Sequence, residues 1–155
     1  MGQSAGDILD SERVELGELS SSLGFLLRVA QLQAFDAFFN RLAPDGLKPG
    51  EFTMLWVVGL NPGLRQGTVA RTLAIKPAHM TKLVQRMVDA GYLLRKTPDN
   101  DRRSVHLSLT DKGQEFVASN RDAFLSLHGD ERATLTPEEA DHLVTLLRRF
   151  TGFED

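Results

Sequence analysis

The sequence predicts a mainly α-helical protein with a small β-hairpin, and three observations support this fold class. Apolar residues recur at the spacing i, i+3, i+4 and i+7 along most of the chain, as in amphipathic helices. Residues 103–109 instead alternate between apolar and polar, as strands do. The 155 residues lie in the size range of one domain, and 41% hydrophobic with 25% charged residues is ordinary for a globular protein.

A first long helix is expected over residues 14–42. Its apolar side chains extend around more than one side, so this helix either lies centrally in the fold or meets a second subunit. Pro44-Asp45-Gly46 should end it. Residues 1–13 are polar and without a pattern, and we expect them to be flexible.

Three further helices are expected in the middle of the chain. One begins near Pro49, which suits a first helical position. A short helix should run from an N-cap at Thr68 to about Leu73, and another over residues 77–90. The last carries an apolar stripe that predicts its buried side, formed by Met80, Leu83, Val84, Met87 and Val88.

Gly91 should end the 77–90 helix, and a hairpin should follow with strands over 92–97 and 103–109. Thr110 is expected to cap a helix running to about His128, and Thr136-Pro137-Glu138-Glu139 begins the last helix with a capping box. Two short helices joined by a tight turn and followed by a hairpin predict a helix-turn-helix with a wing.

The segment from Thr68 to Gly113 closely resembles the winged helix of MarR-type regulators, most specifically in Asp101-Arg102-Arg103 and in Leu107-Ser108-Leu109-Thr110 with Lys112-Gly113. The resemblance extends over about residues 14–151. It implies a winged helix-turn-helix DNA-binding domain over 48–110, flanked by a helical dimerisation region formed by 14–47 and 111–151. Two residues depart from the common pattern: Lys48 stands where a capping Thr is usual, and Ala74 where Gly often occupies the turn.

The charge is unevenly distributed along the chain. The whole chain has a formal net charge of −3, yet residues 64–112 contain ten Lys and Arg against four Asp, which is +6 for that segment and −9 for the remainder. A basic middle between acidic flanks indicates a polyanionic partner. A solvated charged surface is the alternative interpretation.

Two groups of residues are candidates for DNA contact. On the outer face of the 77–90 helix, near the end that such helices insert into the major groove, polar and small side chains can reach base edges, and Arg86 is better placed for phosphate. At the hairpin tip, Arg103 can enter a narrow minor groove; the resemblance implies that Asp101 orients it, and Arg102 would contact phosphate. The alternatives are solvated side chains and an ordinary surface ion pair. The helix candidates are Ala78, His79, Thr81, Lys82, Gln85 and Arg86.

Because one winged helix recognises only a short site, we expect a homodimer on a pseudo-palindromic operator with half-sites about 10 bp apart. The resemblance further implies a repressor released by a small aromatic or anionic effector, bound between the dimerisation helices and the winged helix. The candidate lining is Phe25, Arg28, Leu32, Phe52 and Trp56, with Arg28 as the anion partner. An apolar and aromatic stripe of this kind can equally be plain core.

The sequence offers little support for other classes of protein function. There is no cysteine, so disulfides, thiolate metal sites and thiol sensing are excluded. The four histidines have no metal-binding spacing, and no phosphate loop or nucleophile elbow occurs, so no enzyme, cofactor or metal is expected. Neither a membrane span nor a secretory signal is present, so the cytoplasm is expected. The alternative functions are a winged-helix protein-interaction module and a ligand-independent activator.

Overall fold

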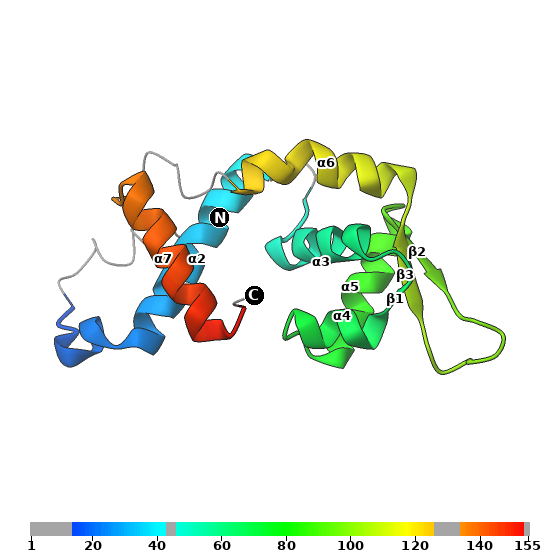
Figure 1. Ribbon diagram of the computed structural model, residues 1–155, viewed down its shortest axis with the longest axis horizontal. Helices are drawn as coiled ribbons and strands as arrows, with labels where there is room; N and C mark the ends of the chain where they lie inside the picture. The colour runs from blue at the N-terminus through cyan, green and yellow to red at the C-terminus, as the bar shows by residue number, and fades with distance from the viewer. Residues whose placement is uncertain (1–13, 43–45, 126–133, 154–155) are drawn as a thin grey trace. The chain divides into compact units, whose positions relative to one another are not determined.

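The computed structural model describes residues 14–42, 46–125 and 134–153, with side chains omitted for 37–42 (Figure 1). Contacts divide the chain into two compact units, one formed by Met1–Arg41 with Asp122–Asp155 and the other by Leu42–Arg121. We refer to these as the helical unit and the winged unit. The described segments are mainly helical and contain one small antiparallel sheet, as the sequence predicts. The expected flexible segment 1–13 and the expected helix end at Pro44-Asp45 lie outside the described residues.

The helical unit contains η1 (Gly17–Ser21), α2 (Leu23–Leu42) and α7 (Pro137–Thr151). The expectation of one continuous helix over 14–42 is wrong, because the backbone is extended at Ser22, with φ −73° and ψ 121°. The Ser20 hydroxyl donates to the carbonyl oxygen of Gly17 at 2.7 Å. Serine side chains that bond to nearby backbone in this way compete with a regular helix, which accounts for the break at this serine run.

The expected capping box at the start of α7 is confirmed. The Thr136 hydroxyl accepts the Glu139 N–H at 3.3 Å, and the Glu139 carboxylate accepts the Thr136 N–H at 2.8 Å. At the other end, Gly152 adopts the left-handed conformation that terminates many helices. Among the described residues, no helix is both long and apolar enough to cross a membrane.

The winged unit contains a small three-stranded sheet of order β1-β3-β2. Strands β2 and β3 are shorter than expected, because residues 97–105 form the hairpin loop, which extends beyond the helices of this unit (Figure 1). Strand β1 was not expected from the sequence and pairs Leu64 with Leu107 and Arg65 with His106. The elements are α3 (Pro49–Leu60), β1 (Leu64–Arg65), α4 (Gln66–Thr72), α5 (Pro77–Asp89), β2 (Leu93–Lys96), β3 (His106–Leu109) and the first part of α6 (Asp111–Leu125), up to Arg121.

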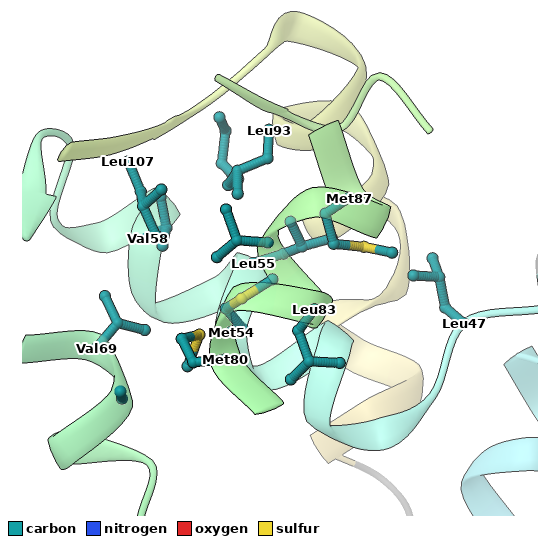
Figure 2. Packing of buried hydrophobic residues seen from close by; sticks show 13 residues of the cluster. Leu47, Met54, Leu55, Val58, Val69, Met80, Leu83, Met87, Leu93 and Leu107 are labelled. Carbon is teal, nitrogen blue, oxygen red and sulfur yellow. The ribbon is translucent and has the colours of Figure 1, made fainter. Parts of the chain in front are cut away.

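The core of the winged unit lies where α3, α4 and α5 meet the inner face of the sheet. Figure 2 shows Met54 and Leu55 of α3 among side chains of α5, with Leu93 and Leu107 of the sheet beside them. The expected stripe of α5 is confirmed, since four members are buried and Val88 packs against the cluster. The buried members are Met80, Leu83, Val84 and Met87.

The turn between α4 and α5 differs from expectation in two details. Helix α4 begins at Gln66 rather than after Thr68, and the Thr68 hydroxyl accepts a bond from Arg71 at 3.2 Å instead of capping the helix. Ala74 has a φ of +52°, a left-handed conformation that no other non-glycine residue of the described segments adopts. The turn therefore places an alanine where glycine is favoured.

Helix α6 is joined tightly to the end of α5. The Thr110 hydroxyl donates to the carbonyl oxygen of Gly91 at 2.6 Å and accepts the Gly113 N–H at 3.0 Å, so the expected cap is confirmed. A Cβ atom at Gly113 would lie 2.1 Å from the carbonyl oxygen of Tyr92. The end of this helix expected near His128 lies outside the described residues, and 111–121 belong to the winged unit by their contacts.

Candidate nucleic-acid interface

The outer face of α5 follows from the burial of its other side. Because Met80, Leu83, Val84 and Met87 face the core, the intervening polar positions turn to solvent. Pro77 occupies the first turn and Lys76 precedes it with extended backbone, so the helix begins as its sequence predicts. The candidate residues exposed on α5 are Ala78, His79, Thr81, Lys82, Gln85 and Arg86.

Thr81 is linked to the preceding helix of the motif. Its hydroxyl accepts a bond from the Gln66 amide at 3.3 Å and donates to the Pro77 carbonyl at 3.1 Å. Gln66 stands at the first position of α4, so its side chain joins α4 to the outer face of α5. No sequence pattern singles out Gln66, because Thr81, its hydrogen-bond partner, is fifteen residues away.

Gln85 is held between two side chains. Its amide nitrogen donates to Asp89 at 2.8 Å, and its amide oxygen accepts a bond from Arg95 of β2 at 3.4 Å. Arg95 contributes to the predicted basic segment, but only the fold brings it beside α5. Any contact of Gln85 with a base therefore replaces or extends this pair of hydrogen bonds.

The hairpin tip is organised around Asp101. One carboxylate oxygen accepts the backbone N–H of Arg103 at 3.2 Å, and the other lies 3.7 Å from the guanidinium of Arg65 on β1. A hydrogen bond from the Ser104 side chain, the Arg103 N–H and the charge of Arg65 together lower the pKa of Asp101 below its usual 3.8, with Ser104 contributing most. Asp101 thus meets Arg103 at its backbone, and its side-chain ion pair is with Arg65, which the sequence interpretation missed.

The base of the wing is tied to β1 through His106. Its Nδ1 lies 2.8 Å from the carbonyl oxygen of Gly63, and its Nε2 lies 3.2 Å from the Ser104 hydroxyl oxygen. Because a carbonyl only accepts hydrogen bonds, Nδ1 carries a proton and donates to it. The imidazole therefore connects the turn before β1 to the loop that carries Asp101.

The Arg86 side chain is partly exposed, and its guanidinium contacts a buried carboxylate. Its guanidinium is 2.9 Å from a carboxylate oxygen of Glu51, which is completely buried, and donates to the Gly46 carbonyl at 2.9 Å. This partnership was not expected from the sequence, which placed Arg86 on a phosphate. The phosphate contact stays a prediction that no observation supports.

Half of the cations in the basic segment have partners within the winged unit. Besides Arg65, Arg86 and Arg95, Arg71 bonds to Thr68, and Lys112 donates to the Ala90 carbonyl and lies over the Tyr92 ring. The other five side chains have no hydrogen-bond or ion-pair partner among the described residues. They are Lys76, Lys82, Lys96, Arg102 and Arg103.

The predicted effector residues are divided between the two units. Phe25, Arg28 and Leu32 lie on α2, where Arg28 and Leu32 are exposed and Phe25 is half-buried. Phe52 and Trp56 lie on α3 in edge-to-face contact, with ring centroids 5.7 Å apart. Phe52 is fully buried and also packs on Phe116, which agrees with the alternative that it belongs to the core. A shared ligand site for the five residues stays a prediction.

No metal centre is found in the described segments, since no group of three His, Asp or Glu side chains is placed to hold an ion. The described winged unit instead combines a helix-turn-helix, an exposed polar face on α5 and a wing that ends in two unpaired arginines. These features define a winged helix-turn-helix DNA-binding protein.

Comparison with known proteins specifies the family. The model of the MarR family matches residues 45–104. A putative transcriptional regulatory protein for the hcr operon of Thauera aromatica is 32% identical over 152 residues, which cover 96% of this chain and 92% of that protein. The homoprotocatechuate degradative operon repressor of Escherichia coli is 26% identical over 80% of this chain and 86% of its own length. The chain belongs to the MarR family of transcriptional regulators, so the predicted family is confirmed.

A solved structure supports the same assignment. The transcriptional repressor CouR, bound to a 23-mer DNA duplex, superposes with a TM-score of 0.79 at 32% identity, over 90% of this chain and 99% of that one. The relatives are transcriptional regulators rather than enzymes, in agreement with the sequence interpretation.

Proposed function

We propose that this protein is a homodimeric repressor that binds a pseudo-palindromic operator in the cytoplasm and is released by a small aromatic or anionic effector. The observation that carries the proposal is the joint exposure of the polar face of α5 and of Arg102 and Arg103 at the wing tip, within one compact unit. A helix in the major groove and an arginine in the adjacent minor groove together supply base contacts and groove-shape recognition. The name of the Escherichia coli relative supports repression.

Exposed apolar side chains of the helical unit support the dimer. Leu23 and Leu26 on α2 are exposed, and so are several large apolar residues on and after α7, where Phe150 reaches 65% exposure. A concentration of apolar surface on terminal helices is typical of a subunit interface. The exposed residues at the C-terminal end are Leu143, Val144, Leu146, Phe150 and Phe153.

Cationic and aromatic side chains support the proposed class of effector. Arg28 offers an exposed cation for an anionic group, and the indole of Trp56, half-buried beside Phe52, offers an aromatic surface. Arg121 also lies 6.0 Å from the Trp56 ring, so a second cation adjoins this aromatic residue. An aromatic carboxylate combines both complementary properties.

The function is tested by selecting duplexes from a random-core pool with the full chain and titrating salt on the enriched duplex. We expect a two-fold symmetric consensus, a dimer by light scattering, and an affinity that falls steeply as salt rises. Failure to retain any duplex at low salt would contradict DNA binding and favour a protein-interaction module. Benzoate then serves as the probe for the effector. If benzoate releases the duplex from the wild-type protein but not from Arg28→Ala, the result supports the proposed effector site. If benzoate releases the duplex equally from both proteins, the result contradicts that site.

A further inference from the structure

A fully buried carboxylate lies at the start of α3 and contacts the recognition helix α5. Glu51 is 0% exposed, and its two oxygens have different partners. Oε2 accepts the backbone N–H of Lys48 at 2.8 Å, and Oε1 lies 2.9 Å from Nη1 of Arg86. The second guanidinium nitrogen, Nη2, donates to the carbonyl oxygen of Gly46 at 2.9 Å.

The cost of burying the Glu51 charge indicates that Arg86 has a structural role. A buried carboxylate is costly unless it is paired and hydrogen-bonded, and Arg86 is the cation paired with Glu51 in the described segments. The Arg86 side chain remains 48% exposed, so the pair sits at the edge of the core. Turning Arg86 outward to a phosphate would leave both the Glu51 charge and the Gly46 carbonyl without this partner.

The geometry also specifies why an arginine stands here. Its guanidinium makes two contacts with the segment leading into α3: Nη2 donates a hydrogen bond to the Gly46 carbonyl, and Nη1 forms an ion pair with Glu51 Oε1, which accepts no hydrogen bond from the described residues. Lysine carries one compact ammonium and reaches only one of these two positions at a time. Arg86 lies one helical turn after Lys82 on the exposed polar face of α5, so its contacts with Glu51 and Gly46 add a constraint on the rotation of this face to the one that the buried stripe imposes. A shift of this face by a fraction of a turn would misalign its side chains with base edges.

On the basis of the proposed DNA binding, we propose that Arg86 is a positioning residue for sequence recognition rather than a phosphate contact, with Glu51 as its buried partner. Through this pair, the segment 46–51 holds α5 in the orientation that reads the operator. The proposal assigns to Glu51, which has no exposed surface, an effect on DNA specificity.

The two possible roles of Arg86, phosphate contact and positioning of α5, predict different results for a lysine substitution. A phosphate contact needs a cation, which Arg86→Lys retains, so that variant would bind all DNA nearly as the wild type does. The positioning role needs one nitrogen beside Glu51 and a second on the Gly46 carbonyl at the same time, so Arg86→Lys should weaken binding to the selected duplex on the order of tenfold while leaving a scrambled duplex of the same length unaffected. The slope of log K against log salt on the scrambled duplex should also stay unchanged.

Two further variants complete the experiment. Glu51→Gln should show the same selective loss, although residue 51 cannot touch DNA. Arg102→Gln supplies the signature of a lost phosphate contact: weaker binding to both duplexes and a salt slope reduced by about 1. All variants are compared at a temperature where their circular dichroism matches that of the wild type. If Glu51→Gln does not fold, Arg86→Lys decides the outcome, because it keeps a cation beside Glu51.

The result that overturns the proposal is an Arg86→Lys variant with wild-type specificity, or an Arg86→Gln variant that follows the pattern of Arg102→Gln. Failure of the wild-type chain to bind either duplex would instead contradict the proposed function itself. The two failures are therefore distinguished by the wild-type measurement alone.

Discussion

Replacing Ala74 by glycine should stabilise the winged unit. Ala74 has a φ of +52° in the turn of the helix-turn-helix, and its side chain is exposed, so removing Cβ sacrifices no buried contact. The left-handed conformation costs a non-glycine residue about 1–2 kcal/mol, while glycine adds about 0.4–1 kcal/mol of unfolded-state entropy to be lost on folding. The difference predicts a net gain of about 0.5–1 kcal/mol in the free energy of unfolding.

Urea denaturation at one fixed protein concentration measures this change, since a dimer's apparent stability depends on concentration. The matched control is Ala118→Gly on the exposed side of α6, where helical backbone makes glycine unfavourable by about 0.5–1 kcal/mol. The two substitutions should move the urea midpoint in opposite directions. If Ala74→Gly lowered the midpoint as Ala118→Gly does, the inferred strain at this turn would be refuted.

Three further predictions concern the wing and its attachment. Gly113→Ala should destabilise the fold by about 1–3 kcal/mol or more in urea denaturation, because the new Cβ would lie 2.1 Å from the Tyr92 carbonyl oxygen. Ser104→Ala should raise the pKa of Asp101 toward 3.8 in a carboxyl NMR titration, because the Ser104 side chain is the largest cause of the lowered value. Arg103→Ala should weaken binding to the selected duplex by about 1–3 kcal/mol while the melting temperature stays nearly unchanged, because the side chain is exposed and unpaired among the described residues.

The sign of the Asp101 effect follows from linkage. Because the pKa is lowered in the folded chain, the charged carboxylate stabilises the fold above its usual pKa, and this contribution is lost as the pH falls through the lowered value. An unchanged Asp101 titration in Ser104→Ala would refute the assigned cause. A Gly113→Ala protein of wild-type stability would contradict the close approach to Tyr92, and a large melting loss in Arg103→Ala would contradict its assignment to DNA.

Local signals in the sequence were sufficient for several elements. The capping box at Thr136, the cap at Thr110 and the buried stripe of α5 each depend on residues within one or two helical turns, and the structure confirms all three. Ala74 was also recognisable as the position where glycine is usual. Its positive φ shows that the turn keeps its geometry despite the alanine.

Features that depend on distant residues could not be predicted. The two residues of β1 form a strand only because β3 lies beside them, and no pattern exists in a segment of that length. The pairing of Arg86 with Glu51 joins residues on two helices, so an arginine on a polar helix face was interpreted as a phosphate contact. Arg65 and Arg95 counted toward the basic charge, but only the fold places them beside Asp101 and Gln85.

The central claim, that α5 and the wing form the DNA-binding surface, is tested most directly by mapping amide chemical shifts of the labelled full chain on titration with the selected duplex. We predict changes concentrated in residues 76–86 and 97–105. Wild-type binding with shifts confined to residues outside 64–112 would contradict the claim, as would the absence of any shift at low salt.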